Sequence, residues 1–284
     1  MLPTLCTLGN LLAGFAAIFY AAKPADAVAP FHWSSLTFAG ALIFVGMFFD
    51  AVDGSVARLT RSTSDLGAQL DSLCDLVTFG VAPAFMMLTL VGKYLTVESG
   101  LVVIGPEADL ALGKIVWGIA AVYVCCAALR LARFNVETES ADLTAHEWFS
   151  GLPSPGAAGA VASLIILHQH RLVANPMIDE LPVSFVRGAA LGIPLITLLC
   201  AWGMVSTMRY THVVNRYLRR PHSFGFAVRL LMPLILAIWW FQETVAIVFT
   251  LYALSGPVGA AWRRRRLRRD HAAAPAAATE TPAE

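Results

Sequence analysis

Residues 34–58 read SSLTFAGALIFVGMFFDAVDGSVAR, and this stretch decides what kind of protein the chain can be. Its first part is an almost unbroken apolar run, and about 20 apolar residues in a helix cross the hydrocarbon core of a bilayer. Two aspartates, Asp50 and Asp53, stand at the end of the run. A charged side chain inside a membrane costs about 2.5–3.5 kcal/mol on insertion scales. The stretch therefore predicts a membrane-spanning helix that carries a functional polar site at one end.

The rest of the chain has the same apolar character. Of its 284 residues, 57% are hydrophobic and 14% are charged, whereas soluble domains are about 45–50% apolar and about 25% charged. This composition excludes a soluble enzyme, a disordered protein and a disulfide scaffold, and predicts an all-α integral membrane protein. Apolar stretches of spanning length predict a bundle of about eight transmembrane helices, at residues 3–22, 34–58, 68–91, 111–134, 153–169, 184–208, 224–242 and 244–262.

Lysine and arginine are distributed unevenly between the connecting segments, and this predicts the orientation of the helices. Cytoplasmic loops carry an excess of both residues. With both termini inside, fourteen of the twenty basic residues fall on the cytoplasmic side. We therefore expect a multi-pass protein of the cytoplasmic (inner) membrane with both termini cytoplasmic. Residues 1–262 form the predicted transmembrane domain. Residues 263–284, basic and then rich in alanine and proline, are expected to be a disordered tail whose arginines attract anionic lipid headgroups.

Four aspartates are predicted to converge just below the cytoplasmic membrane surface. Asp50 and Asp53 lie three residues apart at the end of one helix, and Asp71 and Asp75 lie four apart at the start of the next. Each spacing places its pair on one helix face, and the short link between the helices makes them antiparallel. Hard oxygen donors without histidine or cysteine suit Mg²⁺ or Mn²⁺. Four carboxylates are enough to bridge two such ions, so we expect a cytoplasm-facing metal site.

Small and cationic residues beside the aspartates predict room for a phosphorylated ligand. Gly54 and Gly67 allow a backbone or a ligand to approach closely, and Ala57 leaves further space. Arg58 follows Gly54 by one helical turn and can face a phosphate. Carboxylates for a metal, an arginine and open space together indicate a site for a phosphorylated ligand at the membrane surface.

The aspartates, glycines, alanine and arginine of residues 50–75 also form a known signature. They match the pattern D-x-x-D-G-x-x-A-R-x8-G-x3-D-x3-D at every fixed position, so the chain resembles the CDP-alcohol phosphatidyltransferase family. The resemblance implies that a CDP-linked lipid donates its phosphatidyl group to an alcohol and that CMP is released. It assigns two metal ions, Mg²⁺ or Mn²⁺, to Asp50, Asp53, Asp71 and Asp75. It assigns contacts with the CDP-lipid to Gly54, Ala57, Arg58 and Gly67. Asp75 is the candidate general base for the attacking hydroxyl.

Three further parts of the chain resemble the phosphatidylserine synthases of this family. They are LPTLCTLGN at residues 2–10, TFGVAPA at residues 78–84, and LRLARFN at residues 129–135 followed by FSGLPSP at residues 149–155. This similarity implies CDP-diacylglycerol as donor, the hydroxyl of L-serine as acceptor, and phosphatidylserine as product. Thr7 and Asn10 of the first stretch join the expected contacts with the CDP-lipid. Arg130, Arg133 and Asn135 are candidate ligands of the serine carboxylate, although both arginines also suit a purely topological role.

Other interpretations of the same residues stay open. One is a family member with a different acceptor, a phosphatidylglycerophosphate or phosphatidylinositol-phosphate synthase. A polytopic cation transporter is a remote alternative, because transporters also place aspartates in the membrane, and a catalytically silent relative is a third. Family analogy suggests a homodimer within membrane lipids, and we expect no nucleic-acid partner.

Overall fold

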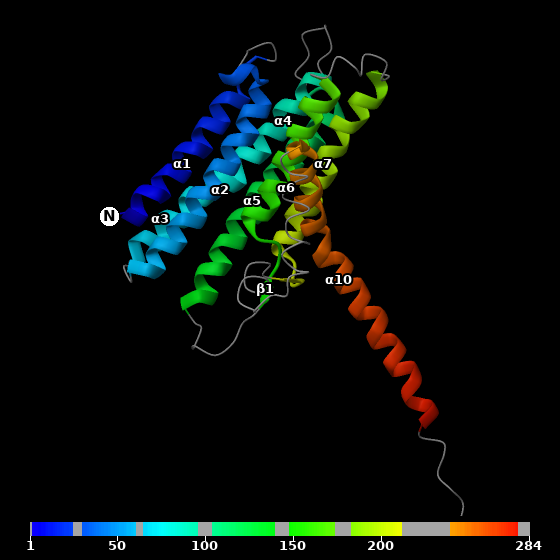
Figure 1. The fold of residues 1–284 in the computed structure, drawn as a ribbon. Coiled ribbons are helices and arrows are strands. Elements are labelled where there is room, and N and C mark those ends of the chain that lie inside the picture. Colours follow the sequence, from blue (N-terminus) through cyan, green and yellow to red (C-terminus); the bar gives the residue numbers. More distant parts are fainter. Residues whose placement is uncertain are drawn as a thin grey trace, which may run out of the picture.

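The computed structural model describes residues 2–24, 30–60, 65–95, 104–139, 148–173, 183–211 and 239–277. Within these ranges the chain is almost entirely helical, and the helices lie side by side in one bundle (Figure 1). A helix satisfies its own backbone hydrogen bonds, as a segment surrounded by lipid must. The longer helices are α1 (Leu2–Ala21), α2 (Ser35–Thr60), α5 (Ala111–Glu139), α7 (Val183–Val205) and α10 (Phe241–Ala277). The shorter ones are α3 (Asp65–Asp75), α4 (Ala82–Leu95), α6 (Ser154–Leu167) and the single 3-10 turn η1 (Pro30–His32).

Six segments in the described part of the chain are long and apolar enough to cross a membrane. The protein is therefore an all-α, multi-pass membrane protein, as the composition predicts. These segments correspond to the predicted helices at 3–22, 34–58, 68–91, 111–134, 184–208 and 244–262. The predicted helix at 153–169 is present as α6, which continues directly into the π-helical segment η3 (His168–Val173). The predicted helix at 224–242 lies almost wholly outside the described residues, so the total of eight stays a prediction.

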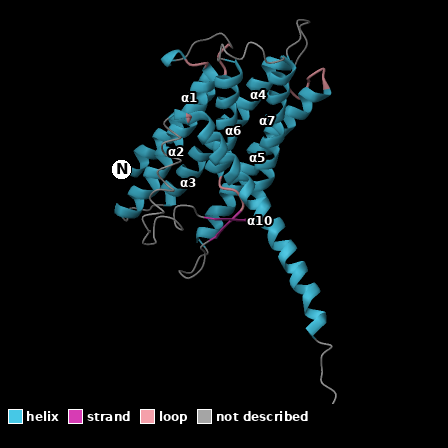
Figure 2. Ribbon diagram, turned by 45° about the vertical axis from the view of Figure 1, so that its right-hand side comes forward, coloured by secondary structure: helices cyan, strands magenta, loops and turns pink. Residues whose placement is uncertain are grey.

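Helix α6 lies at the centre of the bundle (Figure 2) and is built from small residues. Most of its residues are buried, including the run from Gly156 to Ser163. A Cβ atom on Gly156 would come within 2.7 Å of the Tyr252 ring of α10, and one on Gly159 would overlap the Phe249 ring. Small residues let helices approach this closely, and such contacts drive helix association in lipid. The small residues in the first part of α6 therefore let α10 pack closely against it.

A π-helical turn, η2 (Leu76–Val81), connects α3 to α4 without interrupting the helical rod. Its core residues Thr78, Phe79 and Gly80 are buried. The Thr78 hydroxyl donates to the carbonyl of Asn10 in α1 at 2.9 Å, and the Tyr123 hydroxyl of α5 donates to the carbonyl of Phe79 at 3.1 Å. Hydrogen bonds to two neighbouring helices thus stabilise this irregular turn, and π-helical turns are frequent at functional sites. The turn begins immediately after Asp75.

The FSGLPSP stretch forms a compact connection at the end of the bundle where α6 begins. Strand β1 (Trp148–Ser150) pairs antiparallel with β2 (Arg209–Thr211). Gly151 has a φ of 87°, which favours glycine, and its N–H donates to the carbonyl of Met208 at 2.8 Å. Pro153 then precedes the first turn of α6. This two-stranded pairing ties the start of α6 to the segment after α7.

The predicted boundary of the tail does not coincide with the end of a helix. Helix α10 continues through the arginines at 263–269 to Ala277 and extends beyond the bundle (Figure 1). Arginine and alanine are among the strongest helix formers, so the helix does not stop where the apolar run does. The expectation of a disordered tail is therefore wrong for residues 263–277, which are helical. Residues 278–284 lie outside the described part of the chain.

Candidate functional site

The structure brings three of the four predicted aspartates together at one end of the bundle. Asp50 comes from α2, and Asp71 and Asp75 come from α3. One carboxylate oxygen of each lies within 4.8 Å of the other two. Asp75 is buried, with 8% of its surface exposed, whereas Asp50 and Asp71 are half-buried. Three carboxylates this close repel one another unless a cation lies between them.

Asp53 is the fourth aspartate, and it has a different environment. It is also buried, and its Oδ2 accepts a hydrogen bond from the Thr7 hydroxyl of α1. It lies one helical turn beyond Asp50, as the sequence spacing predicts, but it is not part of the group of three. Thr7 therefore fixes the orientation of Asp53 at the edge of the carboxylate cluster.

Asn10 performs the same task for Asp75. Its side-chain amide, which has no exposed surface, donates from Nδ2 to Oδ1 of Asp75 at 2.8 Å. This contact joins residues that are 65 positions apart in the sequence. We expected Thr7 and Asn10 to contact a lipid substrate, whereas the contacts in the structure are with two aspartates. Helix α1 is thus a second wall of the site, and it holds Asp53 and Asp75 by hydrogen bonds.

Helix α5 contributes Asn135 on the opposite side of α3. The Asn135 amide donates to the Ser72 hydroxyl at 2.9 Å, and that hydroxyl donates back to Oδ1 of Asn135 at 3.2 Å. Ser72 directly follows Asp71, so this pair fixes the C-terminal part of α5 against the carboxylate helix. The role of Ser72 was not predicted from the sequence, in which only its position between Asp71 and Asp75 indicates a place beside the site.

The two arginines of α5 are close in sequence but differ in burial. Arg130 is buried, and its guanidinium lies 5.7 Å from the centre of the Phe134 ring. Arg133 is half-buried. Such burial is unusual for an arginine that serves only to orient a helix, because a topological arginine is normally solvated.

The glycines expected to leave space for a ligand lie beside the carboxylates. Both are half-buried. Gly54 in α2 follows Asp50 by four residues, and Gly67 in α3 precedes Asp71 by four residues. Ala57 and Arg58 lie in the last turn of α2, and their side chains are outside the described residues. The predicted contact of Arg58 with a phosphate therefore stays a prediction.

The donor atoms of the cluster fit a hard divalent cation. Oδ1 of Asp71 is buried and has no hydrogen-bond partner within the described part of the chain. A buried carboxylate oxygen without a partner is costly, and a metal ion would satisfy it. The three residues supply only carboxylate oxygens, the ligand type preferred by Mg²⁺ and Mn²⁺. The arrangement can therefore bind a divalent cation and, through it, a phosphate group.

Comparison with known proteins yields one family and a consistent set of relatives. The family model of CDP-alcohol phosphatidyltransferases matches residues 1–199. A protein of Helicobacter pylori is 32% identical over 188 residues, which cover 66% of each chain. One of Methanocaldococcus jannaschii is 28% identical over 75% of this chain and 81% of its own, and one of Bacillus subtilis is 31% identical over 61% and 80%. All three are named CDP-diacylglycerol–serine O-phosphatidyltransferase. The match thus spans slightly less than two thirds of the Helicobacter relative.

Proposed function

The chain belongs to the CDP-alcohol phosphatidyltransferase family, whose model covers residues 1–199, and from this membership we propose that it transfers the phosphatidyl group of CDP-diacylglycerol to L-serine. The products are phosphatidylserine and CMP. The observation that carries the proposal is the convergence of Asp50, Asp71 and Asp75, which are signature residues of the family. The names of the relatives support serine as the acceptor.

The four signature aspartates, Asp50, Asp53, Asp71 and Asp75, would hold one or two divalent cations. When bound, the cations neutralise the charge of the pyrophosphate and of the departing CMP. Asp50, Asp71 and Asp75 already lie close enough to share one ion. Thr7 orients Asp53, and Asn10 orients Asp75. Because hydrogen-bonded ligands hold their geometry, these two α1 residues act on the donor lipid through the aspartates.

The reaction replaces the phosphoanhydride bond between the two phosphorus atoms of the donor by a phosphoester bond to serine. The serine hydroxyl oxygen attacks the phosphorus that carries diacylglycerol, and the bond between this phosphorus and the oxygen of CMP breaks. The hydroxyl proton moves to a carboxylate oxygen of Asp75, and CMP leaves with the electron pair of the broken bond. Asp75 is suited to this task because it is held in place by Asn10 and lies beside the two other carboxylates.

The two substrates approach the cluster from different elements. Gly54, Ala57, Arg58 and Gly67 border the donor on the α2 and α3 side. Arg130, Arg133 and Asn135 face serine from the end of α5, where an arginine fork can bind a carboxylate in two places. Asn135 is already fixed to Ser72 beside Asp71, and this contact supports a serine site next to the proposed metal ligands.

The setting of the reaction follows from the charge distribution. We propose that the protein lies in the cytoplasmic membrane with both termini inside, so that CMP and serine exchange with the cytoplasm. The carboxylate cluster then lies at the cytoplasmic end of the bundle, together with most basic residues. By analogy with the family, the protein is a homodimer in which each protomer has its own site.

A panel of acceptors tests the proposed function. The purified protein in detergent receives CDP-diacylglycerol, Mg²⁺ or Mn²⁺, and one acceptor at a time: L-serine, glycerol 3-phosphate or an inositol phosphate. We expect CMP release with L-serine alone, and none after chelation of the cation. Release with a phosphorylated acceptor and none with serine would retain the family and overturn serine as the substrate. A folded protein that releases no CMP with any acceptor would contradict the proposal as a whole.

A further inference from the structure

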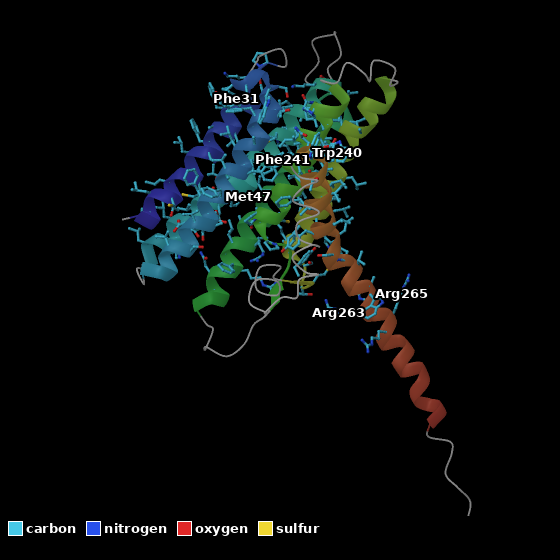
Figure 3. The ribbon with its side chains drawn as sticks, viewed as in Figure 1. Phe31, Met47, Trp240, Phe241, Arg263 and Arg265 are labelled. Atoms are coloured by element: carbon cyan, nitrogen blue, oxygen red, sulfur yellow. The ribbon has the colours of Figure 1, made fainter. Side chains whose placement is uncertain are left out.

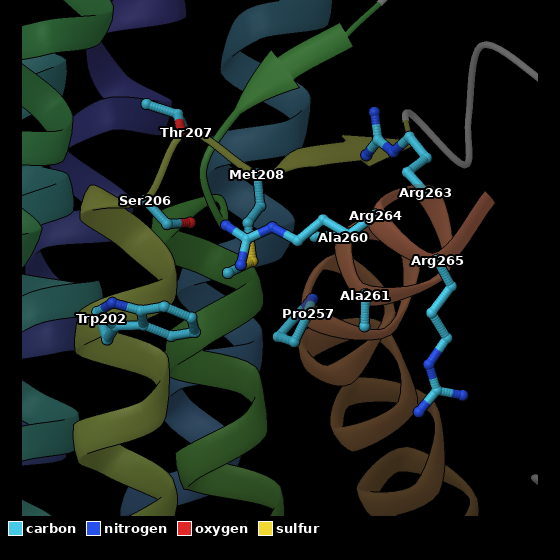
Figure 4. A pocket seen from close by; sticks show the side chains of 10 residues that line it. All are labelled: Trp202, Ser206, Thr207, Met208, Pro257, Ala260, Ala261, Arg263, Arg264 and Arg265. Atoms are coloured by element: carbon cyan, nitrogen blue, oxygen red, sulfur yellow. The ribbon is translucent and has the colours of Figure 1, made fainter. Parts of the chain in front are cut away.

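A second polar site lies outside the family domain, between the end of α7 and the part of α10 that leaves the bundle. It is a pocket of about 740 Å³. Trp202, Ser206, Thr207 and Met208 line it from α7 and the segment that follows, and Pro257, Ala260, Ala261, Arg263, Arg264 and Arg265 line it from α10. Figure 4 shows Arg264 reaching across the pocket toward Ser206 and Met208. None of these ten residues is acidic or belongs to the carboxylate cluster.

The pocket lies at the depth of the lipid headgroups. Trp202 and Trp262 are largely exposed at the ends of the spanning parts of α7 and α10, and exposed tryptophans mark the membrane interface. Arg263 and Arg265 lie on the part of α10 that leaves the bundle, and Trp240 and Phe241 lie at the opposite end of this helix (Figure 3). The spanning part of α10 is itself mostly exposed. Lipid can therefore reach the pocket from the side.

The chemistry of the lining indicates what would bind there. The arginines offer guanidinium donors to a phosphate, and the hydroxyls of Ser206 and Thr207 add polar contacts. Pro257, Ala260 and the Trp202 ring form an apolar wall below them, which suits a glycerol backbone and the start of an acyl chain. A free phosphate would leave most of the volume empty and would gain nothing from this wall.

From this combination we propose that the pocket binds the phosphate-bearing headgroup of an anionic glycerophospholipid, at a site separate from the catalytic centre. Arg264 is the main contact because its side chain crosses the pocket. The bound lipid joins α7 to α10 and anchors the arginine-rich end of α10 to the membrane surface. This proposal does not depend on the acceptor or on the activity of the carboxylate cluster.

The test compares two arginines of the same run. Arg264 lines the pocket, whereas Arg266 does not, and the Arg266 guanidinium lies 5.7 Å from the centre of the Trp262 ring. Native mass spectrometry of the full chain in detergent measures the bound fraction of dioleoyl phosphatidylglycerol, with dioleoyl phosphatidylcholine as the uncharged comparison. We expect preferential binding of phosphatidylglycerol, a loss of at least about fivefold in affinity in Arg264→Gln, and little change in Arg266→Gln, given the worth of one arginine near an anionic surface.

Three results would overturn the proposal. Equal binding of the two lipids would show that no anionic site exists. Equal losses in Arg264→Gln and Arg266→Gln would show that the run acts as a diffuse charge and that Arg264 has no special place. Displacement of the lipid by inorganic phosphate at millimolar concentration would show that the pocket recognises phosphate alone. Both arginines are exposed, so both variants should fold, and an unchanged thermal unfolding midpoint verifies this.

Discussion

Two charged regions lie at the same end of the molecule, and they are built in opposite ways. The carboxylate cluster is at least half-buried, and helix α1 holds its member Asp75 through Asn10 and the adjacent Asp53 through Thr7. The arginines at 263–266 are exposed, and the contacts of Arg263 and Arg266 are with their own helix, at Gly259 and Trp262. The acidic region depends on tertiary structure, whereas the basic region depends mainly on its helix and on lipid.

The difference shows what burial of charge requires. A buried carboxylate needs hydrogen-bond donors or a cation, because desolvation is otherwise too costly. Substitutions around the cluster should therefore have large effects that reach activity, metal binding and stability. Exposed charges interact weakly and one at a time, so substitutions in the arginine run should affect lipid binding and little else.

The largest effect is expected for Asp75→Asn. The substitution keeps the shape of the side chain but removes the proton acceptor and one charge of the metal ligand set. We expect serine-dependent CMP release to fall by about 10³-fold or more, with the protein still folded. Asp109→Asn is the matched control, because Asp109 is exposed ahead of α5, and its activity should equal that of the unmodified protein. If Asp75→Asn releases CMP as fast as the unmodified protein, Asp75 is not the general base.

A smaller effect is expected for Asn10→Ala. Loss of the amide leaves Asp75 without the donor at 2.8 Å, and substitutions behind a metal ligand typically weaken metal binding by about 10- to 100-fold. Titration of CMP release with Mn²⁺ measures the half-saturating concentration, which should rise by this factor. Ser163→Ala, a buried hydroxyl of α6 that bonds to its own helix, serves as control. An unchanged Mn²⁺ requirement in Asn10→Ala would mean that α1 does not support the metal site.

The contact between α1 and the π-helical turn should control stability. A Cβ atom on Gly14 would lie 2.8 Å from Cα of Thr78, and a backbone atom cannot move aside easily. We expect Gly14→Ala to destabilise the protein by about 1–3 kcal/mol, as overpacked cores are. The readout is the thermal unfolding midpoint in detergent. Gly118→Ala should not lower the midpoint, because its Cβ would meet nothing within 4 Å and alanine favours a helix over glycine. Equal midpoints for the two variants would contradict the close approach of α1 and η2.

The smallest effect is expected for Tyr123→Phe. This change removes only the hydroxyl that donates to the carbonyl of Phe79, and one such bond contributes about 1 kcal/mol. The unfolding midpoint should fall slightly, while Tyr20→Phe, at a half-buried position on α1, should not change it. A loss of activity without loss of stability would show instead that the π-helical turn positions Asp75 directly.

The site could be predicted from the sequence to the extent that it depends on local spacing. The separations of Asp50 from Asp53 and of Asp71 from Asp75 are helical, and a short link forces the two helices together. The role of Asn10 could not be predicted in this way, because its contact with Asp75 depends on how α1 packs against η2. The π-helical turn itself has no signal in an apolar run, since its stability comes from the hydroxyls of Thr78 and Tyr123.

The fold shows the same division. Apolar length predicts the spanning helices and also the helix at 153–169, but the central position of α6 is known only from how its small residues pack against neighbouring helices. The end of α10 also differs from the expected disordered tail. The composition of residues 263–277 indicates that they cannot form a hydrophobic core, but alanine and arginine favour a helix even without one.

The central claim is that the carboxylate cluster joins serine to a phosphatidyl group. The most direct test incubates the purified protein with CDP-diacylglycerol, Mn²⁺ and isotopically labelled L-serine, and measures CMP and labelled lipid in the same sample. We predict one labelled phosphatidylserine for every CMP released, and neither product after chelation of Mn²⁺. CMP release accompanied by phosphatidic acid and no labelled lipid would mean that water is the acceptor, and it would contradict the claim.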